Sequence, residues 1–234
     1  MVLVSILLAF FLEGWRQERE LRHDLERELA SVQLALERNR ELAAAEIAAL
    51  DRMSAAGDAV MAGMLSAAGQ RVVAVDDTLA ALALQWRISF APSLGAVDAL
   101  ISSGRLAQIE NPELKLGLAG LSEVIRDVVG DEIQSLEMTN NLLYPELARL
   151  DALPPPGGAM SAFLRSAAEA GLTPQERLGR DPLPSFGSVA LPTAPVIRNY
   201  LRLRLGPLSA ARSEFVLLRD HLDTLVGLIM AEKG

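Results

Sequence analysis

Residues 15–50 have the sequence WRQERELRHDLERELASVQLALERNRELAAAEIAAL, in which charged residues of both signs alternate with regularly spaced apolar ones. The apolar positions recur at steps of three, four and seven residues, a spacing that brings side chains to one face of an α-helix. The residues of this stripe are Leu25, Leu29, Val32, Leu36, Ala43, Leu50 and Met53. The pattern predicts one long helix, extending to about Leu65, that packs in a helical bundle or a coiled coil.

Asn39 lies on the same stripe, at a position where a polar side chain is unusual. In a bundle, such a residue can fix the register of neighbouring helices at some expense of stability. A solvated kink in the helix is the alternative that the sequence leaves open.

The composition also favours helices. Aromatic residues make up only 4% of the 234 residues, whereas Ala and Leu dominate, as in helices that pack through aliphatic contacts. The net charge of −8 argues against a nucleic-acid partner, which requires a basic face. The absence of cysteine excludes disulfide and thiolate chemistry. We therefore expect an all-α fold, arranged as an elongated antiparallel helical bundle.

The first fifteen residues, MVLVSILLAFFLEGW, carry no charge before Glu13. As a helix, residues 1–12 cover about 18 Å, which is less than the roughly 30 Å of membrane hydrocarbon. A signal peptide would need a basic start and a small-residue cleavage site, and a buried helix end would contain more polar interruptions. We expect residues 1–15 to be the outer part of a single transmembrane helix that starts before Met1. Trp15 and Arg16 would lie at the membrane interface, and the span would continue into the long helix.

Residues 94–114, LGAVDALISSGRLAQIENPEL, predict two helices joined by a tight corner. The first helix should stop at Ser103-Gly104, where glycine supplies a left-handed C-terminal cap. Asn111-Pro112-Glu113 then suits the N-cap, N1 and N2 positions of a long second helix. The corner is either purely structural or a docking site for a partner. Its residues are Ser103, Gly104, Leu106, Ile109, Asn111, Pro112 and Glu113.

The pattern divides the chain into four segments. Residues 1–15 are the membrane anchor, and residues 16–150 form the long-helix bundle. Residues 151–195 are a Pro/Gly-rich connection with a short helix, and residues 196–234 are a helix that packs back on the bundle. The apolar positions of that last helix are seven residues apart, at Leu201, Leu208, Phe215, Leu222 and Ile229.

Shorter signals set further boundaries. A helix is expected to begin at Asp76 or Asp77, whose carboxylates suit a helix start, and to continue to Phe90 before Pro92. Pro145 is expected to kink or end the helix that begins at Pro112.

The sequence contains no pattern typical of catalysis. His23 and His221 have no ligand-spaced partners, and Glu132 and Glu137 have no histidine one helical turn away. Nucleophile motifs and a Gly-rich phosphate loop are also missing from the sequence. We expect no catalytic, cofactor-binding or metal-binding residues, and we expect both histidines on a solvated surface.

Two segments together resemble a family of bacterial single-pass membrane proteins. Residues 3–20, LVSILLAFFLEGWRQERE, are similar to the family's short span, which ends in a Trp beside charged residues. Residues 96–121 carry its Ser-Gly-x-Leu-x-x-Ile-x-Asn-x-x-Leu pattern. The positions of that pattern are Ser103, Gly104, Leu106, Ile109, Asn111 and Leu114. The resemblance covers the first half of the chain and implies a membrane-anchored helical protein, but it implies no activity.

These observations predict a non-enzymatic, membrane-tethered helical interaction or scaffold protein of the bacterial inner membrane, with its bundle on the extracytoplasmic side. Its partners would be membrane lipid and, through the heptad helices, a second copy of the chain in a homo-oligomer or another protein. We expect no cofactor. The alternative is an extracytoplasmic helical-bundle domain that senses a small ligand, which requires a pocket with convergent polar groups.

Overall fold

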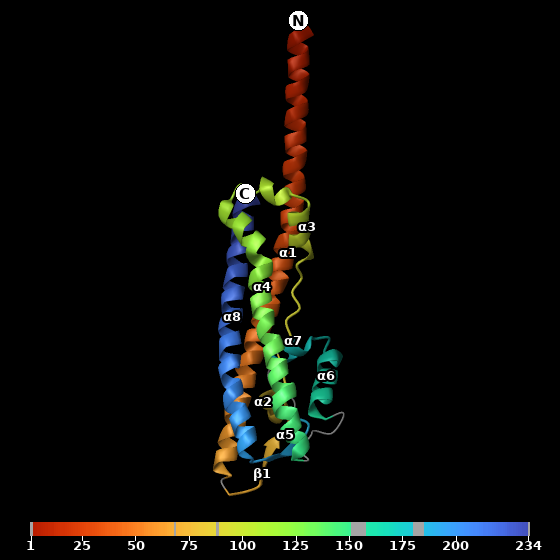
Figure 1. Cartoon of the computed structure of the whole chain (residues 1–234). Coiled ribbons are helices and arrows are strands. Elements are labelled where there is room, and N and C mark those ends of the chain that lie inside the picture. The colour runs from red at the N-terminus through yellow and green to blue at the C-terminus, as the bar shows by residue number, and fades with distance from the viewer. Residues whose placement is uncertain (1, 68, 88, 151–157, 180–184, 234) are drawn as a thin grey trace. The chain divides into compact units, whose positions relative to one another are not determined.

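The computed structural model describes residues 2–67, 69–87, 89–150, 158–179 and 185–233, and these are mostly helical, as predicted (Figure 1). The chain forms two compact units. Unit 1 comprises Met1–Arg40, Pro92–Glu123 and Asp220–Gly234, and unit 2 comprises Glu41–Ala91 and Val124–Arg219. The helices α1 (Val2–Ser66), α4 (Pro112–Met138) and α8 (Pro195–Lys233) contribute residues to both units.

The apolar stripe predicted for α1 is confirmed, because each of its seven members is at most 9% exposed. The first buried residue of the described side chains is Leu25, whereas residues 11–23 are exposed. In the part of the chain that the structure describes, no helix combines the length and the apolar character needed to cross a membrane. Met1, and the side chains of residues 2–10, lie outside that part.

Unit 1 contains three helices that lie side by side, together with the short helices α3 (Gly95–Ser102) and η1 (Arg105–Gln108) (Figure 1). Arg40 of α1 pairs with Asp223 of α8 at 2.9 Å, and Lys233 donates to Gln33 at 3.2 Å. The higher numbers of one helix thus meet the lower numbers of the other, so α1 and α8 are antiparallel here. The buried apolar residues that join the elements of unit 1 include Leu29, Val32, Leu36, Val97, Leu100, Leu114, Leu118, Leu121, Leu222, Leu225 and Ile229.

Asn39 is fully buried within unit 1, which excludes the solvated kink. Its Nδ2 donates to the carbonyl of Ser93 at 2.9 Å, and its Oδ1 accepts from the amide of Ser93 at 2.8 Å. One side chain thereby satisfies both backbone groups of a residue that belongs to no helix or strand. The polar residue in the apolar stripe of α1 is therefore the position at which the chain around Ser93 is attached to this helix.

Unit 2 adds a two-stranded sheet that the sequence did not predict. Strands β1 (Val72–Asp76) and β2 (Ser188–Pro192) pair antiparallel, with Val72 opposite Pro192 and Asp76 opposite Ser188. Helix α2 (Asp77–Leu84) follows directly, and the carboxylate of Asp76 caps it by accepting from the amide of Leu79 at 3.0 Å. The start of α2 was predicted, but its end at Leu84 comes earlier than the predicted Phe90, because buried side chains bind the backbone that follows.

The remaining elements of unit 2 lie around Pro145 and in the predicted connection. The π-helical turn η2 (Thr139–Leu143) and helix α5 (Tyr144–Arg149) follow α4. Pro145 has no amide hydrogen to donate one turn back, so the regular α-helical pattern is interrupted there, as predicted. Within 151–195 the structure describes α6 (Ala159–Glu169), α7 (Pro174–Leu178) and β2. Residues 151–157 and 180–184 lie outside the described part.

The heptad positions predicted for α8 are confirmed as core positions. Leu201, Leu208, Phe215, Leu222 and Ile229 are each at most 2% exposed. The helix runs through Pro207 without ending. On α4, the buried apolar residues are Leu114, Leu118, Leu121, Ile125 and Val128, while the side chains of Glu132, Ile133 and Leu136 lie outside the described residues.

Replacing Asn39 tests the attachment of the extended segment. Asn39→Leu keeps the size of the side chain but leaves the amide and the carbonyl of Ser93 buried without partners. We expect the free energy of unfolding, measured by urea denaturation, to fall by about 2–4 kcal/mol. The matched control is Asn199→Leu at an exposed site of α8, which should change it by less than about 0.5 kcal/mol. Equal losses in the two variants would contradict the attachment.

Candidate functional site

The corner between α3 and α4 has the backbone geometry that the sequence predicted. Gly104 adopts a left-handed conformation with a φ of +74°, and its amide donates to the carbonyl of Ile101 at 3.1 Å. The side chain of Asn111 accepts from the amides of Glu113 at 2.9 Å and Leu114 at 3.1 Å, so it caps α4. These contacts end one helix and start the next.

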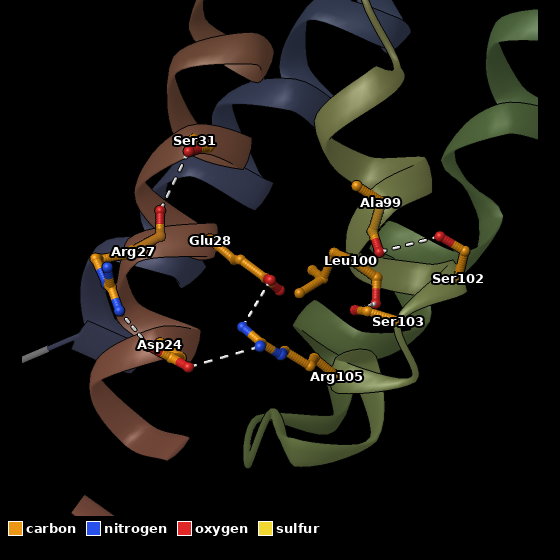
Figure 2. A network of polar contacts seen from close by, with 9 residues as sticks. All are labelled: Asp24, Arg27, Glu28, Ser31, Ala99, Leu100, Ser102, Ser103 and Arg105. Carbon is orange, nitrogen blue, oxygen red and sulfur yellow. Dashed lines mark hydrogen bonds and ion pairs between the residues drawn. The ribbon is translucent and has the colours of Figure 1, made fainter. Parts of the chain in front are cut away.

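Arg105 attaches the corner to α1 (Figure 2). Its guanidinium lies 2.7 Å from a carboxylate oxygen of Glu28 and 3.6 Å from one of Asp24. Asp24 also pairs with Arg27 on its own helix. The sequence analysis missed Arg105, because its partners on α1 are distant in sequence and an isolated arginine in a corner resembles a solvated one.

Glu232 of α8 binds the backbone of the same corner. Its two carboxylate oxygens accept from the amides of Glu110 at 2.5 Å and Asn111 at 3.0 Å. Lys115 also donates to the carbonyl of Ala107 at 3.1 Å. Most polar groups of the corner thus already have hydrogen-bond or ion-pair partners within unit 1.

The remaining residues predicted for the corner differ in their exposure. Ile109 is buried and Leu106 is half-buried, so of these two apolar side chains only Ile109 fully enters the core. The hydroxyl of Ser103 donates to the carbonyl of Leu100 at 3.1 Å (Figure 2). Pro112 and Glu113 are exposed. The geometry therefore accounts for most of the motif by folding alone.

The two histidines differ from one another. His23 is exposed, as expected, with Nδ1 3.5 Å from Glu26. The expectation for His221 is wrong, because it is half-buried and its Nε2 is buried without a hydrogen-bond partner. It lies on α8 where α4 approaches closely: a Cβ on Gly117 would be 2.5 Å from Leu225 and 3.7 Å from His221. Among the described residues, no group of three or more His, Cys, Asp or Glu could hold a metal ion.

In unit 2, a buried arginine holds the segment that follows α2. Arg204 of α8 is 3% exposed, and its guanidinium donates to the carbonyl of Leu84 at 2.6 Å and to the carbonyl of Trp86. It also donates to the hydroxyl of Tyr200 at 2.9 Å. That hydroxyl in turn donates to Leu84 and lies 3.0 Å from the hydroxyl of Thr139. In the described part of the chain, Arg204 forms no ion pair with a carboxylate.

Glu46 of α1 binds the same segment through an amide. It is 2% exposed, and one carboxylate oxygen accepts from the amide of Ser89 at 3.3 Å.

The two aromatic residues of the segment pack edge-to-face in the core of unit 2. Trp86 contacts Phe163 with 4.9 Å between ring centroids, and Phe90 contacts Phe215 with 5.1 Å. The segment therefore has fixed positions at both its backbone and its side chains.

A pocket of about 570 Å³ lies against this segment, entirely within unit 2. Trp86 and its neighbours line one side, Thr139 and Tyr144 a second, and Met160 and Leu164 of α6 a third. The volume falls within the range of about 300–1,000 Å³ that is typical of small-molecule sites. No local sequence signal predicts this pocket, because its walls come from widely separated stretches of the chain.

No protein-family model, no curated protein and no solved structure matches this chain. The resemblance to a family of membrane-anchored proteins therefore remains a prediction from the sequence.

Alanine substitutions at two glycines test the left-handed cap at Gly104. A Cβ would meet nothing within 4 Å at either Gly104 or Gly120, but only Gly104 has a positive φ. Gly104→Ala should lower the free energy of unfolding by about 1–2 kcal/mol, because alanine is strained in the left-handed region. Gly120→Ala, in the α4 helix, should raise it by about 0.5–1 kcal/mol. Thermal denaturation compares the two, and a Gly104→Ala variant as stable as the natural protein would contradict the left-handed cap.

Proposed function

We propose that this protein is a non-enzymatic, membrane-tethered helical interaction module, and that the apolar N-terminal end of α1 inserts into a lipid bilayer. The observation that carries this proposal is the exposure of large apolar side chains at that end. Phe11 is 72% exposed, and Leu12 and Trp15 are both more than half exposed, although they lie on a continuous helix. Such a cluster is unfavourable in water and favourable in lipid.

The residues next to the apolar end fit a membrane interface. The guanidinium of Arg19 lies 5.5 Å from the centroid of the Trp15 ring. Trp15 therefore has a charged residue beside it on one side and the apolar residues Phe11 and Leu12 before it in the helix. Arg16 forms an ion pair with Glu20 at 3.1 Å, and both are exposed. This order of apolar, aromatic and then charged residues is typical of a helix leaving a bilayer. In this proposal, residues 1–15 anchor the protein in a bacterial inner membrane, and the helical units lie on its extracytoplasmic side.

The heptad positions of α1 and α8 are buried within the chain itself. This favours intramolecular packing over a coiled coil between copies. A protein partner would then use apolar side chains that the described structure leaves exposed, such as Leu34 and Leu116 in unit 1 and Leu217 in unit 2.

Vesicle flotation tests the proposed tether. The 234-residue chain should float with vesicles of phosphatidylcholine and phosphatidylglycerol. The triple substitution Phe11→Ser, Leu12→Ser and Trp15→Ser should reduce the floating fraction at least about tenfold, because three large apolar side chains no longer enter the lipid.

The matched control is Leu34→Ser, Leu116→Ser and Leu217→Ser, which removes three other exposed apolar side chains and should leave flotation unchanged. A natural chain that stays at the bottom of the gradient would contradict the proposal. Equal losses in both triple variants would also contradict it.

A second candidate function is ligand sensing by the helical domain, and the pocket of unit 2 is the observation that favours it. The interior beside this pocket is not simply apolar, because Thr139 lines it and connects through Tyr200 to the buried Arg204. Ligand binding distinguishes the two functions, since a scaffold requires none.

A further inference from the structure

We infer that the pocket of unit 2 binds a small organic carboxylate with an apolar body. This inference rests on the second candidate function, ligand binding by the helical domain, and it specifies the chemical class of the ligand. Three features of the pocket carry it: an apolar wall, a set of unpaired hydrogen-bond donors, and a described lining that contains a cation and no acid.

The apolar wall comes mainly from α6 and α7. Met160 and Leu164 of α6 and Pro174 of α7 line the pocket, and the indole of Trp86 faces it from the other side. Leu164 is 44% exposed, so a large apolar side chain at the pocket remains uncovered by the chain itself. An aliphatic or aromatic body of a ligand would cover this surface and gain the free energy of apolar burial.

The indole N–H of Trp86 is an unsatisfied donor at this pocket. Trp86 is 6% exposed, and its Nε1 is buried without a hydrogen-bond partner. The ring cannot easily turn toward another acceptor, because it packs edge-to-face on Phe163 and its own carbonyl is bound by Arg204. A buried unpaired donor is costly, so a small shift of the wall that brings Nε1 into contact with an acceptor oxygen of a ligand would be favourable.

Arg87 supplies the charge at the pocket. It lines the pocket and is exposed, and it forms no ion pair or side-chain hydrogen bond in the described part of the chain. The neutral side chains of Gln85 and Asn140 also line the pocket, and they form no hydrogen bond within the described part of the chain. No Asp or Glu occurs among the described lining residues. Donors and a cation without an acid are the complement of an anion.

Arg204 extends this positive field from behind the pocket wall. Its charge is buried and is solvated by carbonyl and hydroxyl oxygens only, through a chain of hydrogen bonds that reaches Thr139 at the wall. The buried carboxylate of Glu46, which accepts from the amide of the lining residue Ser89, opposes this field, so the preference for an anion depends on the charge of Arg87 in the lining itself. A single planar guanidinium with an apolar wall suits a carboxylate, whose two oxygens match the guanidinium fork, better than a multiply charged phosphate.

The experiment compares two probes of the same shape, 4-phenylbutyrate and its neutral amide, 4-phenylbutyramide. Trp15→Phe leaves Trp86 as the only tryptophan of the chain, so its fluorescence reports on this pocket. We expect a saturable change in Trp86 fluorescence with the carboxylate, at a Kd at least about tenfold lower than with the amide.

Arg87→Gln in the same background should raise the Kd for the carboxylate about tenfold and leave the Kd for the amide nearly unchanged, because only the charge–charge contact is lost. Since Arg87 is exposed, folding should be retained, and circular dichroism checks this. The control Arg202→Gln removes an exposed arginine that does not line the pocket, and it should change neither constant.

The outcomes separate this inference from the function on which it rests. Equal binding of the two probes would overturn the carboxylate class while retaining ligand binding. Binding of neither probe, at concentrations up to the millimolar range, would overturn both. Loss of affinity in Arg202→Gln equal to that in Arg87→Gln would show that the charge acts non-specifically and would overturn the assignment to this pocket.

Discussion

Residues 85–87 and 89–94 have no helix or strand, although the protein is mostly helical, and their backbone groups require hydrogen-bond partners. Three buried side chains supply them. Arg204 binds the carbonyl of Trp86, Glu46 binds the amide of Ser89, and Asn39 binds both groups of Ser93. Leaving such groups unpaired would cost about 1–3 kcal/mol each, so this segment constrains which polar residues the core must contain.

The positions of Asn39 and Glu46 connect this constraint to the sequence. They are seven residues apart on α1 and fill the two gaps in its apolar stripe, between Leu36 and Ala43 and between Ala43 and Leu50. The same helical face therefore packs apolar side chains at most positions and attaches the extended segment at two. Asn39 acts within unit 1 and Glu46 within unit 2. Within unit 2, the contacts of Glu46 and Arg204 also hold Trp86 at the wall of the pocket.

Local signals predicted much of the fold. The spacing of apolar residues identified the long helices, and the caps at Gly104 and Asn111 were predicted because they depend on residues only a few positions apart. The strands were missed because β1 and β2 are far apart in sequence and each is short. Arg204 and Glu46 were missed because a charged residue on a helix is normally solvated, and only tertiary packing shows that these two are buried. The pocket was missed for the same reason, since no single stretch contains its walls.

The claim that buried side chains hold residues 85–87 and 89–94 can be tested by native-state hydrogen exchange, resolved to single amides by NMR. The account predicts that the amides of Ser89 and Ser93 exchange slowly, with protection comparable to the core amides of α1, although neither residue lies in a helix or strand. Exchange of both amides at the rate of an unstructured peptide would contradict it.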